Sequence, residues 1–310
     1  MKIDRMIEIP SELGAGTRGA SLGINALKLC AAEKGMTLLA RLPQQRVEDE
    51  NDLLFKPPLP ENAHYIRGIY TVMSHAADVI ADACTLTDSM LILTGDHSNA
   101  IATLAGIRKA RPGDRLGVIW IDAHADLHTP YTSPSGNIHG MPLAASLGLD
   151  NMECKRHEPH KVSREYWEKL KNIGGIKPKL LPGDIVFLGL RSFEAEERFL
   201  LDKHEIARYD TDEIRKTGLA RCISKSLEHL QQCDRIHISF DVDSMDPSVS
   251  RGTGTPVEGG LMPEEVIELL KGLTRDKRVR TLEITEINPL LDNRNKMAKT
   301  VLQILGEVIE

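Results

Sequence analysis

The sequence predicts an α/β fold built around a parallel sheet. Short apolar runs rich in β-branched residues recur along the chain, helical stretches separate them, and acids and histidines follow several of the runs directly. Runs this short are typical of strands that are buried on both faces of a sheet. Because strands and helices alternate, we expect parallel pairing. Ligands of such sheets bind beyond the carboxyl ends of the strands, which is where the acids and histidines lie.

The expected strands are Met90–Thr94, Leu116–Ile121, Ile185–Leu190, Ile236–Phe240 and Thr281–Thr285. The expected helices are Tyr65–Cys84, Asn99–Lys109, Glu194–His204, Leu219–Gln232, Pro263–Leu273 and Lys296–Glu310. Pro263 precedes two glutamates, and proline and acids are both favoured in the first turn of a helix.

Two stretches look peripheral. Gln44–Glu61 is polar and proline-containing, and Lys155–Pro182 is rich in lysine. We expect both to be solvated surface loops, with one short helix around Tyr166–Asn172; an interface role is the alternative. There is no internal repeat, and no linker rich in proline or glycine divides the chain, so we expect a single domain over residues 1–310.

Composition excludes several classes of protein. Of the 310 residues, 41% are hydrophobic and 27% charged, as in ordinary globular proteins. A net charge of −6 argues against a nucleic-acid partner, and no run of about 18 apolar residues predicts a membrane span. The N-terminus lacks the apolar stretch of a secretory signal. The five cysteines form no CxxC pair, so we expect reduced thiols in a cytoplasmic protein.

The densest chemical signal is a set of acids and histidines after three strands. Asp122, His124 and Asp126 are spaced i, i+2, i+4, which in extended backbone places all three on one face. Asp241 and Asp243 repeat this spacing, and a further histidine, His97, follows a third strand. Four carboxylates together would repel one another, whereas two divalent cations would cancel their charge. The alternative is that these are turn and helix-cap residues.

The ligand types indicate which metal the site would hold. No cysteine is near in sequence, so a thiolate site is excluded, and oxygen ligands with two imidazoles suit Mn²⁺, with Zn²⁺, Co²⁺, Fe²⁺ or Ni²⁺ as alternatives. Two metals that share one water lower its pKa towards neutrality, and the hydroxide can attack carbon or phosphorus. The residues therefore predict a binuclear metallohydrolase.

Three motifs resemble the signatures of the ureohydrolase (arginase/agmatinase) family. They are Gly95–Ser98, Asp122–Asp126 and Ser239–Pro247, and the similarity extends from Ile9–Gly14 to Glu286–Pro289. The resemblance implies a three-layer α/β/α sandwich around a mainly parallel sheet, two Mn²⁺ ions, and hydrolysis of a guanidine or amidine C–N bond. It also implies a homo-oligomer, commonly a trimer or hexamer.

The resemblance assigns a ligand pair to each metal and two bridging carboxylates between them. The pairs are His97 with Asp126 and His124 with Asp243, and the bridges are Asp122 and Asp241. Asp246, in the third motif, would be structural rather than a ligand.

The segment Thr129–Gly140 resembles arginases in particular. By that resemblance Ser135 and Asn137 would hold the α-carboxylate of the substrate, and His139 would shuttle protons, as suits a side chain that titrates near neutral pH. Thr255 and Glu286 match positions that contact the guanidinium or order the site, and a carboxylate can make two parallel hydrogen bonds to such a group.

Two positions depart from the arginase pattern. His128 stands where arginases carry asparagine, and it could still donate a hydrogen bond, bring positive charge or signal a different substrate. Glu194 stands where arginases usually have an aspartate that contacts the α-amino group, and Glu197 matches a later acid. The alternative for both glutamates is a solvated first helical turn, where acids are favourable.

The resemblance thus implies hydrolysis of L-arginine to L-ornithine and urea, by attack of a metal-bridging hydroxide on the guanidinium carbon. Asp126 would pass a proton to the leaving amine, His139 would exchange protons with solvent, and Glu286 would orient the guanidinium. The alternatives are agmatine, guanidinobutyrate, formiminoglutamate or guanidine as the substrate, or a binding or regulatory role without catalysis.

Overall fold

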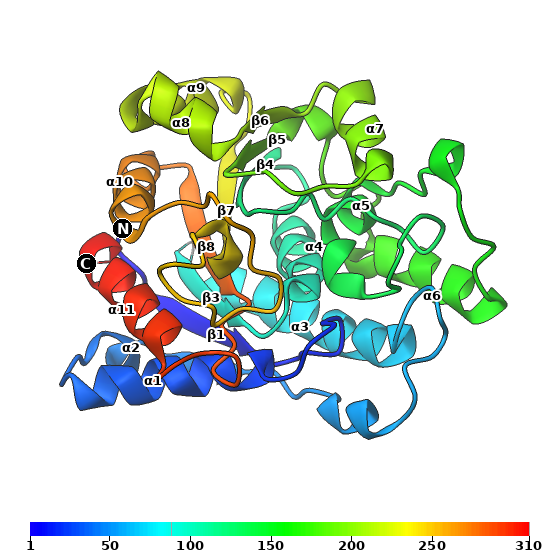
Figure 1. Cartoon of the computed structure of the whole chain (residues 1–310), viewed down its shortest axis with the longest axis horizontal. Helices are drawn as coiled ribbons and strands as arrows, with labels where there is room; N and C mark the ends of the chain where they lie inside the picture. The colour runs from blue at the N-terminus through cyan, green and yellow to red at the C-terminus, as the bar shows by residue number, and fades with distance from the viewer. Residues whose placement is uncertain (88, 310) are drawn as a thin grey trace.

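The predicted parallel sheet is present in the computed structural model, which describes residues 1–87 and 89–309. Within these residues eight strands form one sheet in the order β2-β1-β3-β8-β7-β4-β5-β6, and all neighbours are parallel (Figure 1). In that order the strands are Gln44–Arg46, Arg5–Ile9, Met90–Thr94, Val279–Thr285, Arg235–Asp241, Leu116–Ile121, Ile185–Leu188 and Ala207–Tyr209.

Helices cover both faces of the sheet, which confirms the three-layer architecture (Figure 1). Alternate strand residues enter opposite cores: in β4, Val118 and Trp120 join one core, and Ile119 and Ile121 the other. The helices on the Trp120 side are α3 (Ile66–Leu86), α4 (Ala100–Ala110), α5 (Pro142–Leu147), α6 (Lys161–Lys171) and α7 (Ala195–Lys203). Those on the other side are α1 (Gly23–Glu33), α2 (Leu38–Arg41), α8 (Thr211–Thr217), α9 (Leu219–His229), α10 (Pro263–Leu273) and α11 (Lys296–Val308).

The five expected strands and six expected helices are all present, but the two peripheral stretches are more ordered than expected. The loop prediction for Gln44–Glu61 was wrong in part, because it contains edge strand β2 and a 3₁₀ helix, Asn51–Phe55. In Lys155–Pro182 the helix α6 begins earlier than predicted and buries Trp167. Glu310, the last residue of the final expected helix, lies outside the described residues. None of the described helices is long and apolar enough to cross a membrane.

The two central strands carry polar side chains on one face. In β7, Ile238 and Phe240 belong to the core beside α10 and α11, whereas Ser239 between them points to the opposite layer. Glu283 of β8 is in register with Ser239, and both are fully buried. A buried polar stripe therefore lies under the carboxyl end of the sheet, where the candidate site is.

Candidate active site

The carboxyl ends of three sheet strands bring the predicted metal ligands together. His97 begins a 3₁₀ helix directly after β3, Asp122 follows the last residue of β4, and Asp241 ends β7. Asp243 lies in the short 3₁₀ helix Val242–Ser244 that continues from β7. Because these strands are parallel, side chains far apart in sequence meet at one edge of the sheet.

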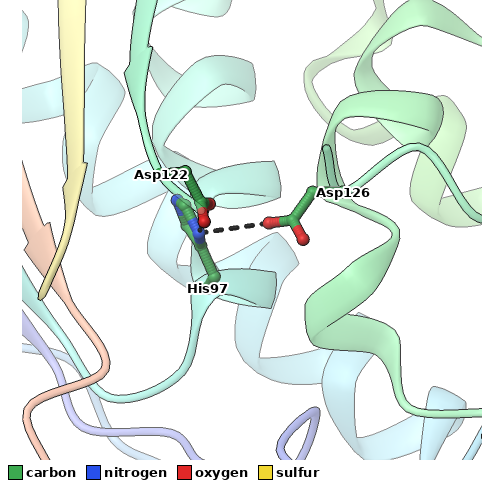
Figure 2. Close-up of side chains that lie close together, drawn as sticks. All are labelled: His97, Asp122 and Asp126. Carbon is green, nitrogen blue, oxygen red and sulfur yellow. Dashed lines mark ion pairs between the residues drawn. The ribbon is translucent and has the colours of Figure 1, made fainter. Parts of the chain in front are cut away.

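His97 is the centre of the first group of ligands. Its Nδ1 lies 3.0 Å from Asp122 Oδ2, 3.1 Å from Asp126 Oδ2 and 3.2 Å from Asp241 Oδ2; Figure 2 shows how His97, Asp122 and Asp126 converge. All four side chains are buried. In the described part of the chain, His97 Nδ1 and Asp126 Oδ2 make no hydrogen bond. Buried polar atoms are rarely left so, and a cation bound here would satisfy both atoms.

His124 forms the second group. Its Nδ1 lies 3.0 Å from Asp243 Oδ2 and 3.6 Å from Asp122 Oδ1. Asp122 thus turns Oδ2 towards His97 and Oδ1 towards His124. One carboxylate serves both groups, so the geometry of the donor atoms fits two neighbouring cations.

The protonation states of the ligands reflect a site crowded with negative charge. Burial raises the pKa of Asp126 to about 6 and, with repulsion from Asp243 and Asp122, that of Asp241 well above its ordinary value. Burial alone would lower the pKa of His97, but the close contacts of its Nδ1 with the carboxylates of Asp122, Asp126 and Asp241 raise it well above normal. A histidine must be neutral to bind a metal. Divalent cations would therefore replace imidazolium protons as the positive charge among these carboxylates.

Neighbouring side chains hold the ligands in place. The indole of Trp120 stacks on the His97 ring with centroids 4.1 Å apart, and its Nε1 donates to Asp122 Oδ2 at 2.9 Å. Thr255 Oγ1 donates to Asp243 Oδ2 at 2.9 Å. Such contacts to the ligands orient them before any metal arrives.

Two acids of the site have left-handed backbone conformations. Asp126 has φ 54° and Glu286 has φ 65°, values that are uncommon for residues other than glycine. Backbone hydrogen bonds hold both: Asp126 O accepts from Leu143 N at 3.1 Å, and Glu286 N donates to Gly95 O at 2.9 Å. Conformations of this kind concentrate at functional sites, where the surrounding structure imposes them.

His139 and Glu286 form a pair behind the ligands. His139 Nδ1 lies 3.2 Å from Glu286 Oε1, and the same oxygen accepts from the His97 backbone N–H at 3.0 Å. Burial would lower the pKa of His139, but the hydrogen bond and charge of Glu286 raise it to about 9. Glu286 thus favours the protonated form of His139.

The predicted site residues surround a cavity of about 190 Å³. Glu286 does not line it, because that carboxylate is buried beneath His97 and His139. The other predicted residues all line it: His97, Asp122, His124, Asp126, His128, Ser135, Asn137, His139, Glu194, Glu197, Asp241, Asp243 and Thr255.

At the mouth of the cavity, His128 is fully engaged by the protein. Its Nε2 lies 3.0 Å from Glu194 Oε2, and its Nδ1 lies 3.2 Å from Thr132 Oγ1. The hydrogen bond from His128 lowers the pKa of Glu194 to about 2, whereas burial raises that of Glu197 to about 8. Both ring nitrogens of His128 thus have partners within the protein, Thr132 and Glu194.

Glu194 is the N-cap residue of α7 and Glu197 lies in its first turn, but Glu197 is buried rather than solvated as the alternative interpretation expected. Glu197 Oε2 accepts from the Glu194 backbone N–H at 3.0 Å, and Oε1 accepts from Leu127 N at 3.0 Å. Glu197 thus connects α7 to the loop that carries Asp126 and Leu127, while Glu194 is half-exposed at the cavity.

The loop that carries Ser135 has a partner that the sequence did not reveal. Ser135 is exposed and its Oγ accepts from Asn137 N at 3.2 Å. Asn137 Oδ1 lies 3.0 Å from His64 Nδ1, and the His64 backbone N–H donates to Gly136 O at 2.8 Å. No local pattern marks His64, because its contacts join segments distant in sequence.

Ser239 and Glu283 were also missed, although a signal existed. Each is a polar residue flanked by apolar neighbours within an expected strand. Alternation of this kind places polar groups on one face of a buried sheet. His97 Nε2 lies 2.8 Å from Ser239 Oγ, so the stripe reaches a candidate ligand.

Comparison with known proteins identifies the family. The sequence matches the model of the Arginase family over residues 5–310. The chain belongs to the arginase family. It is 34% identical to the arginase of Bacillus subtilis (strain 168) over 309 residues, 98% of this chain and 96% of the relative. The crystal structure of the Bacillus subtilis arginase aligns with a TM-score of 0.82 and 32% identity, covering 99% of this chain and 98% of the other.

A second solved arginase has a similar fold. The crystal structure of the Entamoeba histolytica arginase in complex with L-ornithine aligns with a TM-score of 0.85 and 28% identity, covering 99% of both chains. The ureohydrolase resemblance and the α/β sandwich are thereby confirmed. The protein is an arginase-family hydrolase whose strand ends carry histidine and aspartate groups suited to metal binding.

Proposed function

We propose that the protein hydrolyses a guanidino substrate at a binuclear manganese centre, and that the substrate is L-arginine, which yields L-ornithine and urea. The observation that carries the proposal is the pair of histidine–aspartate groups joined through Asp122. Oxygen donors with two imidazoles suit Mn²⁺, although other divalent ions of the first transition row compete for such sites. The names of the arginase relatives support the choice of substrate.

The assigned ligands are His97, Asp122, Asp126 and Asp241 around the first cation and His124, Asp243, Asp122 and Asp241 around the second. Bound cations would neutralise these carboxylates and lower the pKa of water at the site. Two uncharged side chains orient ligands before a cation binds: Trp120 stacks on His97, and Thr255 donates a hydrogen bond to Asp243.

The residues of the chain then handle protons. Asp126 lines the cavity, and from there it would take a proton from water and return it to the leaving amine. His139 also lines the cavity, and Glu286 holds its Nδ1. Its Nε2 is therefore the nitrogen that would exchange protons with solvent.

Recognition of the substrate is assigned to the mouth of the cavity. Ser135 and Asn137 would hold the α-carboxylate, since hydroxyl and amide groups both donate hydrogen bonds. Glu194 would hold the α-amino group, because it is half-exposed and its pKa is low. His128 would act through Glu194 rather than touch the substrate. Glu286 and Thr255 would order the guanidinium end through His97 and Asp243.

A substrate panel on manganese-loaded protein tests this proposal. Urea release is measured with L-arginine, agmatine, guanidinobutyrate and guanidine, and formamide or ammonia release with formiminoglutamate; metal-depleted protein is the control. We expect a clear preference for L-arginine. A preference for another compound would keep the metal chemistry and overturn the carboxylate and amine assignments. If metal is bound but no compound of the panel is hydrolysed, the result would favour a binding protein.

Association and location belong to the same proposal. We propose a homo-oligomer, a trimer or a hexamer, which light scattering of the purified protein would test. Cys30, Cys154, Cys222 and Cys233 are free thiols, and three of these four are buried. Free thiols suit a reducing compartment, which supports a cytoplasmic protein.

A further inference from the structure

A chain of hydrogen bonds runs from His97 away from the cavity into the protein. His97 Nε2 lies 2.8 Å from Ser239 Oγ, and Ser239 Oγ donates to Glu283 Oε1 at 3.2 Å. The other carboxylate oxygen, Oε2, accepts from Thr103 Oγ1. All four side chains are buried. These contacts thus connect the candidate metal site, at the carboxyl edge of the sheet, to the layer between the sheet and α4.

The sheet register places these groups. Ser239 of β7 and Glu283 of β8 are paired in the parallel ladder, so their side chains lie side by side on the same face. Thr103 reaches them from α4, which covers that face. The arrangement is built on two central strands and a helix, and rigid elements of this kind hold side chains more accurately than loops do.

The chemistry of the carboxylate sets the direction of the hydrogen bonds. The hydroxyl hydrogen of Ser239 goes to Glu283 Oε1, so the Ser239 oxygen is left to accept from His97 Nε2–H. This tautomer leaves a lone pair on His97 Nδ1, the atom that faces Asp122, Asp126 and Asp241. A neutral imidazole with a free lone pair is the form that binds a metal.

The charge of Glu283 also lacks a local counterion. Within residues 1–87 and 89–309, no lysine or arginine forms an ion pair with it, and its side-chain partners are two hydroxyl groups. Glu8, a buried glutamate elsewhere in the sheet, pairs with Lys28 and Arg46 instead. Burying an unpaired carboxylate is costly. A metal cation bound to His97 would supply the positive charge that offsets this cost.

We infer that Glu283 is a positioning residue for the cation held by His97: through Ser239 it fixes the imidazole tautomer and adds negative charge behind the ligand. The inference rests on the metal centre of the proposed function. Carboxylates that contact a histidine ligand directly are a known way to orient it. Here the carboxylate acts through an intervening serine.

Metal affinity, rather than turnover, tests this inference. Metal-free wild type, E283Q, S239A and the double variant S239A/E283Q are titrated with MnCl₂ by isothermal calorimetry. Glutamine keeps the size and an accepting oxygen but removes the charge. We expect wild type to bind two equivalents, and S239A to bind one of them about 10–100-fold more weakly. E283Q should weaken the same equivalent by about tenfold, and the double variant should be no weaker than S239A.

E8Q is the matched control, because it neutralises a buried glutamate of the same sheet whose ion-pair partners are Lys28 and Arg46. It should lose thermal stability while both manganese equivalents bind as in wild type. Unchanged manganese affinity in S239A and E283Q, or additive losses in the double variant, would overturn the relay. If E283Q does not fold, S239A alone decides. A wild type that binds no manganese would refute the metal centre itself, which separates the two failures.

Discussion

The inner end and the mouth of the cavity are built on different principles. At the inner end, His97, Asp122 and Asp241 come from the ends of central strands, and the indole of Trp120 holds His97 and Asp122 in place. At the mouth, the side chains come from loops and a helix start, and Ser135 is exposed. The strand ends of the sheet thus carry the candidate metal ligands, and loops carry the residues to which substrate recognition is assigned.

The two departures from the arginase pattern both lie at the mouth and contact each other. His128 and Glu194 are 3.0 Å apart, although 66 residues separate them in sequence. The six candidate metal ligands, by contrast, all keep the residue types of the family motifs. The difference teaches that the two substitutions act as one unit, and that a change of substrate would be made there without altering the inner end.

The largest effect is expected at the inner end. H124A removes the centre of the second ligand group, so we expect loss of metal and a fall in turnover of more than about a thousandfold. Elemental analysis after manganese loading, with the activity assay, measures both. H75A, an exposed histidine on α3, is the control and should match wild type. An H124A protein that retains two metals would refute the ligand assignment.

A smaller loss is expected behind the ligands. H139N keeps a polar side chain in the cavity but cannot titrate, so we expect kcat to fall by about 10²–10⁴-fold while metal content stays unchanged. Stopped assays in parallel with elemental analysis separate the two quantities. If kcat is unaffected, His139 has no role in proton transfer and the pairing with Glu286 is structural.

The mouth should respond more weakly and in a substrate-dependent way. H128N leaves Glu194 without its partner, so we expect KM for L-arginine to rise about tenfold with little change in kcat. The double variant H128N/E194D restores the residue types that arginases carry and should recover most of the loss. An equal rise in KM for L-arginine and guanidine would show that His128 and Glu194 do not recognise the amino-acid end of L-arginine.

The smallest effect concerns Asp246, which shares a motif with the ligands but lies outside the site. Hydrogen bonds from the Ser248 side chain and from the N–H groups of Ser248, Gly260 and Gly259 lower its pKa to about 2. A carboxyl with a lowered folded pKa stabilises the protein above its unfolded pKa and loses that effect as the pH falls through about 2. We expect D246N to cost about 1 kcal/mol at pH 7, after allowance for solvent screening.

Chemical denaturation of both proteins between pH 7 and pH 3 measures this difference. The gap between wild type and D246N should be constant down to about pH 4 and shrink below it. A gap that grows on acidification would mean that the carboxylate of Asp246 does not supply the stabilisation.

The sequence alone determined the parallel α/β architecture and the six candidate ligands. Both depend on local patterns, namely apolar runs of strand length and acids at i, i+2 spacing directly after them, and a parallel sheet gathers its strand ends at one edge. Two of the elements that escaped prediction, β2 and the early turns of α6, are short or polar, so tertiary contacts rather than their own sequence stabilise them.

Only the tertiary structure decided the contacts between distant segments. His64 meets Asn137, His128 meets Glu194, and Ser239 links His97 to Glu283 because the fold sets the register of β7 on β8 and the position of α7 beside the ligand loop. No local spacing encodes these pairs. Side-chain partners across a sheet follow from strand order and register, which the packing of the whole core selects.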